Sequence, residues 1–208
     1  ILGEGNTSMA CDTETFWVKA SGSELRTASA RNFVQVRRAD LLDLLDAGSM
    51  DDAAVLDRLQ AAKVDSQAMR PSVEAVLHAI CLDLPGVSVV GHTHPTAINA
   101  FACARDFERV VNLRLFPDHV VLCGPVSAVV PYIDPGLPLA RAVHDCLRAF
   151  TDEHGAPPRD VYLRSHGYIA LGDSPRRVLD ITRMAIKTAR INLGTAACGG
   201  PHPLPPQN

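Results

Sequence analysis

The chain lacks several features that mark whole classes of protein. None of its apolar runs is long enough to cross a bilayer, and its first residues do not resemble a signal peptide. It has no long run of lysine or arginine, and its net charge of -3 argues against a nucleic-acid surface. The first residue is not methionine, so we expect the chain to be trimmed at its N-terminus. These absences predict a cytoplasmic globular protein whose partners are neither membranes nor nucleic acids.

Paired cysteine motifs are also missing. The six cysteines are scattered and form no Cys-x-x-Cys pair, which argues against a zinc site built on cysteine. We expect them to be small buried residues in a reducing compartment. Apolar residues make up 47% of the 208 residues and charged residues 21%, as in ordinary globular domains. This composition predicts one domain over residues 1–197, followed by a loose tail over residues 198–208 that is rich in proline and glycine.

Helix-like and strand-like patterns alternate along the chain and predict an α/β class. Residues 3–8 have the composition of a loop. Hairpin-like pairs around Gly124 and Gly167 suggest a sheet that is at least partly antiparallel. The predicted strands cover residues 15–20, 33–36, 87–94, 119–123, 127–133, 160–166 and 168–171, and the predicted helices cover residues 40–47, 51–62, 71–84, 96–104, 138–154 and 175–193.

The tripeptide His92-Thr93-His94 carries the clearest chemical signal. Residues i and i+2 of a strand point to the same face, so both imidazoles can reach one metal ion. His166 ends another predicted strand, and Glu74 lies in the first turn of the helix that precedes the His92 strand. Three histidines and a carboxylate make a typical catalytic metal set with one position open to substrate. His78 is a rival ligand at i+4 from Glu74, but we expect it to be a partly exposed helix residue.

Three segments have the composition of anion-binding loops. They are Gly5-Asn6-Thr7-Ser8, Ser21-Gly22, and Ser72, which we expect to be a helix N-cap. Next to a metal set, they suggest a phosphate or carboxylate beside a metal-bound carbonyl. Lys19 could add a positive charge there, although an exposed lysine with its stem along the strand is the commoner explanation.

These motifs together resemble the class II aldolase/adducin family, which includes L-fuculose-phosphate and L-rhamnulose-phosphate aldolases. The matching segments run from Gly5 to about Leu193. The resemblance implies a three-layer α/β/α domain around a largely antiparallel sheet, assembled as a homotetramer with active sites between subunits. It implies a divalent metal, usually Zn²⁺, with Mn²⁺ or Co²⁺ as alternatives. The implied roles are metal ligation by His92, His94 and His166, acid/base catalysis by Glu74, and phosphate binding by Gly5, Asn6, Ser21, Gly22 and Ser72.

Some positions depart from the family pattern. Val73 replaces a serine of the phosphate loop, and Ser165 stands where asparagine is common. No tyrosine lies near residues 116–118, where the family's fuculose-phosphate aldolases supply one to a neighbouring subunit. Residues 131–136 look more like other branches of the family, including the aldolase part of proteins fused to a dehydrogenase. The second acid is open, and Tyr132, Asp118 and His119 are candidates for it.

The resulting functional prediction is a metal-dependent carbon–carbon lyase. It would cleave or form an aldol bond in a small ketose phosphate or a related hydroxy-carbonyl compound, with the metal as a Lewis acid that stabilises an enediolate. Decarboxylation of a 3-oxo acid and 4-epimerisation use the same kind of intermediate and are alternatives. A non-catalytic binding module, as in adducin heads, belongs to a different class, and we would expect such a module to lack the metal ligands.

Overall fold

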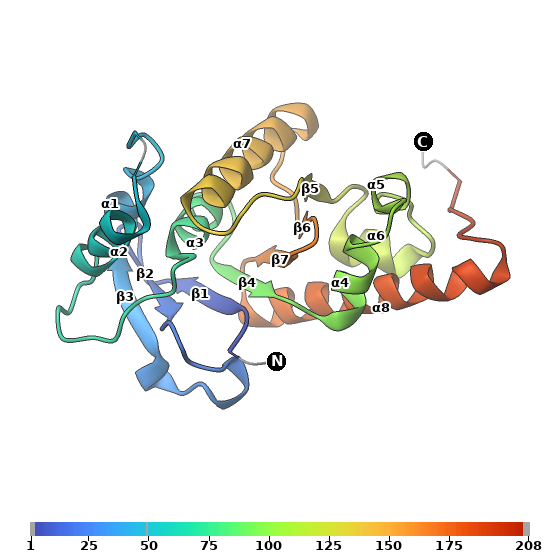
Figure 1. Cartoon of the computed structure of the whole chain (residues 1–208). Helices are drawn as coiled ribbons and strands as arrows, with labels where there is room; N and C mark the ends of the chain where they lie inside the picture. Colours follow the sequence, from blue (N-terminus) through green and yellow to red (C-terminus); the bar gives the residue numbers. More distant parts are fainter. Residues whose placement is uncertain (1–2, 49, 206–208) are drawn as a thin grey trace.

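A seven-stranded mixed sheet with helices on both faces forms the centre of the molecule (Figure 1). This computed structural model describes residues 3–48 and 50–205. The strand order is β3-β2-β1-β4-β7-β6-β5, and every neighbouring pair is antiparallel except β5 and β6. The predicted three-layer α/β/α class with a largely antiparallel sheet is therefore confirmed.

The sheet brings segments from opposite ends of the chain together at its centre. Strand β4 lies between β1 and β7, with Asn6 opposite His92 and His92 opposite Ile169. Strands β6 and β7 form an antiparallel hairpin, as predicted around Gly167. The strands are β1 (Asn6–Ala10), β2 (Thr15–Lys19), β3 (Phe33–Arg37), β4 (Val89–Thr93), β5 (Ala128–Val130), β6 (Asp160–Leu163) and β7 (Gly167–Gly172).

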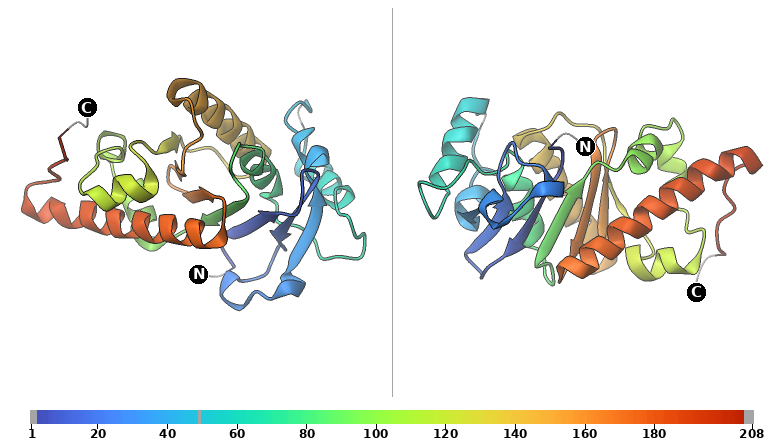
Figure 2. Two further views of the ribbon diagram at one scale, coloured as in Figure 1. Left: turned by 180° about the vertical axis from the view of Figure 1, so that it is seen from behind. Right: turned by 90° about the horizontal axis from the view of Figure 1, so that it is seen from below.

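Two apolar cores lie on opposite faces of the sheet. Figure 2 shows α8 crossing one face of the central strands, while α3 and α7 cover the other face. The helices of the α3 side are α1 (Arg38–Leu42), α2 (Asp52–Ala61), α3 (Ala75–Leu82) and α7 (Leu137–His154). Those of the α8 side are α4 (Thr96–Ala102), α5 (Phe107–Val110), α6 (Pro117–Cys123) and α8 (Pro175–Thr195), and short 3₁₀ turns cover Leu25–Thr27, Ala30–Asn32 and Ala196–Cys198.

Helix α8 illustrates how local sequence sets an element. The Ser174 hydroxyl accepts a hydrogen bond from the backbone N–H of Arg177 at 3.3 Å, and Pro175 occupies the first turn, as the sequence predicts. Val178, Ile181 and other small or apolar residues at helical spacing form its buried face. Among the described residues, no helix has the length and apolarity that crossing a membrane requires.

One predicted strand is wrong. Residues 119–123 belong to helix α6, which begins at Pro117 and ends before Gly124 at a φ of 84°. His119 and Cys123 are both buried on the same side of this helix, four residues apart. The aliphatic run between them has strand propensity, but the contact with α8 decides the outcome. No hairpin therefore forms around Gly124, and β5 pairs in parallel with β6 after the crossover through α7.

Smaller corrections concern the ends of the chain and the cysteines. Residues 6–8 form the start of β1 and not a loop. Three cysteines, Cys11, Cys103 and Cys198, are exposed, contrary to the expectation that all are buried. In the tail, Leu204 N–H donates to the carbonyl of Arg114 at 2.7 Å, and residues 206–208 lie outside the described residues. The division into a domain over residues 1–197 and a tail stays a prediction.

Candidate active site

Three histidine rings converge where β4 ends and β7 begins. His92 lies within β4, His94 follows that strand, and His166 immediately precedes β7. Their ligand atoms all lie within 4.8 Å of one another, and the Nε2 atoms of His92 and His94 are 2.9 Å apart. Within the described ranges, no other group of three or more His, Cys, Asp or Glu side chains has this geometry. The structure thus brings together all three predicted ligands.

The donor set fits a divalent cation. Two ligands of a tetrahedral zinc ion, each at ~2.0–2.1 Å, lie roughly 3.3 Å from each other. The Nδ1–H group of His92 donates to the carbonyl of Tyr168 at 3.2 Å, which leaves its Nε2 lone pair facing the cluster. Burial and the neighbouring His92 and His166 lower the pKa of His94 to about 4. His94 is therefore neutral at neutral pH and keeps a lone pair for a metal.

Two residues with positive φ, Gly5 and Ser165, lie next to the segments that carry the histidines. A β-carbon on Gly5 would lie 2.6 Å from the carbonyl oxygen of His92, and Gly5 has a φ of 71°. Ser165, just before His166, is the only described non-glycine residue with positive φ, at 53°. A side chain at Gly5 would push β1 away from the histidine strand, so glycine is required there. Gly5 therefore has a packing role, and its predicted contact with a phosphate is untested.

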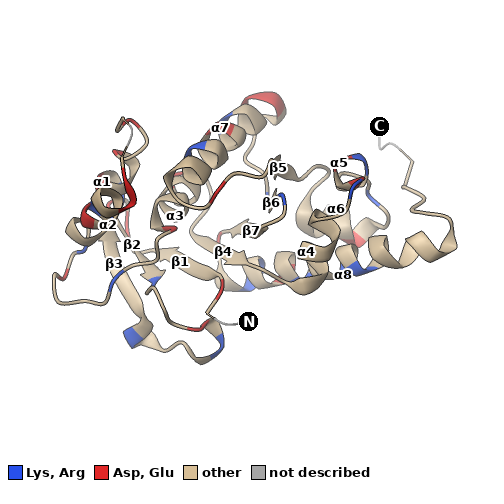
Figure 3. Ribbon diagram, in the orientation of Figure 1, with Lys and Arg blue, Asp and Glu red and all other residues tan. Residues whose placement is uncertain are grey.

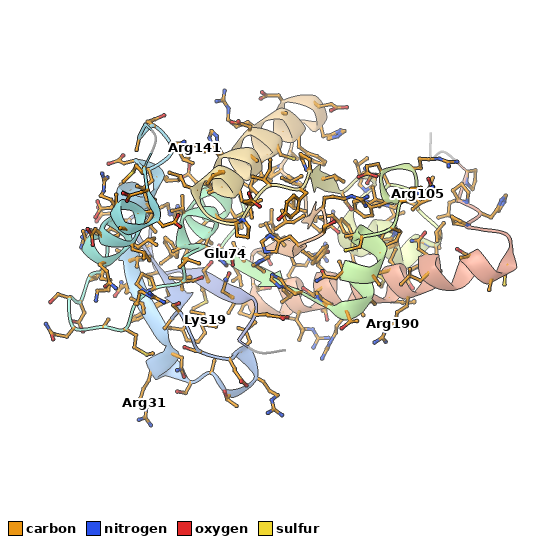
Figure 4. The ribbon with its side chains drawn as sticks, viewed as in Figure 1. Lys19, Arg31, Glu74, Arg105, Arg141 and Arg190 are labelled. Atoms are coloured by element: carbon orange, nitrogen blue, oxygen red, sulfur yellow. The ribbon has the colours of Figure 1, made fainter. Side chains whose placement is uncertain are left out.

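Glu74 lies at the start of α3, as Figure 4 shows. It contacts two members of the histidine cluster. Its Oε1 atom is 3.4 Å from Nε2 of His92 and 3.5 Å from Nε2 of His166. Burial would raise the pKa of this carboxyl, but the hydrogen bond and charge of His92, with Asn6 and His166, outweigh burial and hold the pKa well below its usual value. The sequence predicts Glu74 in the first turn of the helix, whereas the structure has it one position earlier, at the N-cap of α3.

Asn6 and Ser72 connect Glu74 to the predicted anion loops. The Asn6 side-chain NH₂ group donates to Oε2 of Glu74 at 2.7 Å and to the Ser72 hydroxyl at 3.1 Å. That hydroxyl also accepts from the backbone N–H of Glu74 at 3.2 Å. The prediction that Ser72 is the N-cap of α3 is therefore wrong, but Ser72 still caps a backbone donor just before the helix. Asn6, Ser72 and Glu74 form one connected group.

His78 is fully buried, which contradicts the expectation of a partly exposed helix residue. Its Nδ1 atom lies 2.6 Å from the hydroxyl of Ser8, and its Nε2 atom contacts Oδ1 of Asn6. Both ring nitrogens are engaged with β1, so His78 is not available as a metal ligand. Its spacing from Glu74 makes His78 a rival metal ligand in the sequence. The packing of α3 against β1 rules this role out, because it directs both ring nitrogens to residues of β1.

The Ser21-Gly22 turn lies next to the segment that leads into α3. The N–H group of Ser21 donates to the carbonyl of Arg70 at 2.9 Å, and Nη2 of Arg70 donates to the Ser21 hydroxyl at 2.9 Å. Gly22 has a φ of 79°. Sequence reasoning missed Arg70, although its position directly before Pro71 and Ser72 is a signal that could have found it. Ser21 thus lies beside residues 70–72, the stretch of backbone that contains Ser72.

Lys19 is buried, contrary to the alternative of an exposed strand lysine, with only 3% of its surface accessible. Its ammonium donates to the carbonyls of Ser23 and, at 3.4 Å, Ala20. Burial lowers the pKa of Lys19, while the negative charge of Glu74 opposes that change. Lys19 therefore fixes the turn that contains Ser21 and Gly22.

A cavity lined partly by charged side chains opens beside the histidine cluster. It has a volume of about 380 Å³, lies beside His94 and Thr93, and is lined by Glu24 and Arg26 among others. Elsewhere, Figure 3 shows acidic residues around α1, α2 and the end of α7, and basic residues along α8. His94 is the cluster histidine that lines this cavity, so a small molecule bound there would lie next to His94.

None of the three candidates for the second acid contacts the cluster. Tyr132 is 56% exposed, and its hydroxyl donates to Asp134 at 2.9 Å. Asp118 is paired with Lys187 at 3.9 Å, and His119 is buried with neither ring nitrogen hydrogen-bonded. In the part of the chain that the structure describes, none of the three forms a hydrogen bond or ion pair with the histidines or Glu74.

Comparison with known proteins gives the family. A family model described as "Class II Aldolase and Adducin N-terminal domain" matches residues 2–193. The chain belongs to this family. A solved N-terminal class II aldolase domain of a conserved protein from Thermoplasma acidophilum is 29% identical, covers 93% of this chain and 85% of that chain, and gives a TM-score of 0.73.

Two further relatives of this class II aldolase-family chain differ in what they show. The L-fuculose-1-phosphate aldolase from Thermus thermophilus is 18% identical with a TM-score of 0.65, over 96% of this chain and 87% of that chain, which shows the fold alone. A protein named "Uncharacterized oxidoreductase YuxG", from Bacillus subtilis (strain 168), is 30% identical over 195 residues. That match covers 90% of this chain but 26% of YuxG, so the chain spans about a quarter of this relative's length.

Proposed function

We propose that this class II aldolase-family chain is a divalent-metal-dependent carbon–carbon lyase acting on a small ketose phosphate or a related hydroxy-carbonyl compound. The observation that carries the proposal is the convergence of three imidazoles with the carboxylate of Glu74, whose Oε1 lies 3.4 Å from His92 and 3.5 Å from His166. Three imidazoles leave a fourth position for substrate, as in catalytic zinc sites. Zn²⁺ is the proposed metal, with Mn²⁺ and Co²⁺ as alternatives.

His92, His94 and His166 would hold the cation. When bound, it would supply a Lewis acid that stabilises the negative charge of an enediolate, which is the costly feature of aldol cleavage. Glu74 would accept a proton from the carbon next to the carbonyl during condensation and return it to that carbon after cleavage. Its low pKa supports a carboxylate that is ionised at neutral pH and so can accept a proton.

An anionic group of the substrate would bind near the Ser21 turn. Gly5, Asn6, Ser21, Gly22 and Ser72 are the residues proposed for it. The link from Ser72 through Asn6 to Glu74 supports a substrate that spans the distance from this turn to the histidines. The hydroxyl groups and backbone N–H groups there suit phosphate or carboxylate oxygens.

A homotetramer with active sites between subunits is part of the proposal. None of the three candidate acids contacts the cluster within the described chain, and a neighbouring copy that supplies an acid would complete the site. Light scattering on purified protein checks this assembly. A monomer with full activity would contradict it.

Metal content is the first test. Plasma mass spectrometry should find close to one zinc, manganese or cobalt ion per wild-type chain and almost none in His94→Ala. His154→Ala removes an exposed imidazole outside the cluster and should keep the metal. Wild-type protein that stays metal-free even after reloading would overturn the lyase proposal and favour an adducin-like binding module.

The products distinguish the reactions open to the same site. Aldol cleavage releases an aldehyde, decarboxylation of a 3-oxo acid releases carbon dioxide, and a 4-epimerase returns an isomer without net cleavage. The metal-loaded protein should be incubated with ketose phosphates and 3-oxo acids, and all three products measured. We expect aldehyde release from a ketose phosphate, and Glu74→Gln should suppress it with metal content unchanged.

A further inference from the structure

His78 joins α3 to β1 at the back of the site. Asn6 and Ser8 are two residues apart on β1, so their side chains point to the same face, toward α3. The imidazole lies between them, with Nδ1 2.6 Å from the Ser8 hydroxyl and Nε2 against Oδ1 of Asn6. All three side chains are buried, so each hydrogen bond must have a donor and an acceptor.

The carboxylate of Glu74 determines which way the Asn6 amide faces. An ionised carboxylate only accepts hydrogen bonds, so the group 2.7 Å from Oε2 must be the NH₂ group of Asn6. The carbonyl oxygen of the same amide therefore faces His78. The reversed amide would put that carbonyl oxygen against the carboxylate, where the two negative atoms repel each other.

The orientation of Asn6 in turn determines the tautomer of His78. A carbonyl oxygen accepts only, so Nε2 must carry the hydrogen. Burial lowers the pKa of His78 to about 3, and the ring is neutral at neutral pH. Its Nδ1 therefore has a lone pair and accepts from the hydroxyl of Ser8. A consistent chain of donors runs from Ser8 through His78 and Asn6 to Glu74.

We infer that His78 is a positioning residue, which donates Nε2–H to Asn6 and so holds the Asn6 NH₂ group toward Glu74 and Ser72. The effect on turnover rests on the proposed function, because it requires Glu74 to act on the substrate. The hydrogen-bonding role does not. Without a donor at residue 78, the amide of Asn6 is free to reverse, and Glu74 loses the bond that fixes its Oε2 atom.

The tautomer is tested without any assay of activity. Long-range ¹⁵N–¹H NMR on protein labelled at histidine should show a neutral His78 ring protonated at Nε2, with His78→Gln assigning the signals. Ser8→Ala should leave the hydrogen on Nε2. A ring protonated at Nδ1, or at both nitrogens at neutral pH, would overturn the inference whether or not the protein is a lyase.

Kinetics on the metal-loaded protein test the consequence. His78→Leu removes the donor and should lower kcat about tenfold or more with normal metal content. His78→Gln offers an amide N–H in its place and should retain kcat within about threefold. Cys81→Ala, a buried change on the same helix that leaves this network intact, should lower the melting temperature but not kcat.

A double variant separates positioning from general damage. Because His78 acts through Asn6, adding His78→Leu to Asn6→Ala should cause no further loss of kcat. Additive losses, or equal losses in His78→Leu and Cys81→Ala, would overturn the inference. Absence of metal and turnover in wild type would instead sink the proposed function, and the NMR result would then decide the inference alone.

Discussion

Gly167 lies directly against the imidazole of His94. A β-carbon at this glycine would fall 2.6 Å from Cδ2 of His94 and 3.0 Å from the carbonyl oxygen of Thr93. The ring would have to move, because the β-carbon would also fall 3.1 Å from Nε2 of His94, the atom that faces His92 in the histidine cluster. Gly167→Ala should therefore weaken zinc binding by about 10-fold or more, as losses of ligand orientation do. Competition with a coloured chelator measures the dissociation constant.

The control for this prediction is Gly194→Ala. Gly194 lies near the end of α8, and outside its own helix backbone nothing comes within 4 Å of where a β-carbon would lie, so alanine should leave zinc affinity unchanged. It should also raise stability slightly, because alanine favours a helix more than glycine does. Equal zinc affinity in Gly167→Ala and wild type would show that His94 has room to adjust.

Ser165 has a left-handed backbone immediately before His166, with a φ of 53°. Asparagine tolerates this conformation better than serine, and a β-branched residue tolerates it poorly. Ser165→Asn should raise the free energy of unfolding by a few tenths to ~1 kcal/mol, and Ser165→Val should lower it by about 1–2 kcal/mol. Urea unfolding of chelator-treated protein measures both.

Ser66 provides the comparison for Ser165. It is exposed in a loop and is not among the described residues with positive φ. Ser66→Val should change stability by less than about 0.5 kcal/mol, as most surface substitutions do. A similar cost for valine at both positions would mean that the left-handed conformation of Ser165 carries no penalty.

The histidine cluster was predictable because two of its members are neighbours on one strand and the third lies at a hairpin that the sequence indicates. His92 and His94 share a strand face by their spacing, and the hairpin at Gly167 places His166 directly before β7, the strand that pairs with β4. The long helices α7 and α8 were predictable too, since their apolar residues recur at helical spacing over several turns. The assignment of roles to these residues came from the family resemblance and not from periodicity.

Strand β1 was missed for a physical reason. Its inward-facing residues, Asn6 and Ser8, are polar because they bind Glu74, Ser72 and His78, so the segment has the composition of a loop. The burial of His78 could not be predicted for the same reason, because its partners lie on this strand, about 70 residues earlier. Strand propensity likewise misled at residues 119–123, where packing against α8 favours a helix.

Zinc should stabilise the fold through its ligands. A metal that binds the native state but not the unfolded chain adds about 2.7 kcal/mol when its free concentration is about 100 times the dissociation constant. The melting temperature of wild type should therefore rise as buffered zinc increases, and His92→Ala should abolish that rise. His154→Ala should follow the wild-type curve. A zinc-induced rise that persists in His92→Ala would place the stabilising ion elsewhere.

Asp160 should make stability fall as the pH rises. This carboxyl is fully buried and accepts from the Tyr168 hydroxyl at 2.8 Å. Burial raises its pKa from 3.8 to about 6, against the opposing effect of Ser127, Tyr168 and Arg114. Between these values the folded protein holds a proton that the unfolded chain has lost, so this stabilisation is complete below pH 3.8 and is lost as the pH rises through 6. The full loss corresponds to ~3 kcal/mol.

Asp160→Asn removes this titration and nearly preserves the shape of the side chain. Its stability relative to wild type should rise between about pH 4 and pH 7 by up to ~3 kcal/mol, measured by urea unfolding of chelator-treated protein. Tyr168→Phe removes a hydrogen bond that favours the ionised carboxylate, so its fall in stability should extend to a higher pH than in wild type. Parallel curves for Asp160→Asn and wild type across this range would mean that Asp160 ionises as readily in the folded protein as in the unfolded chain.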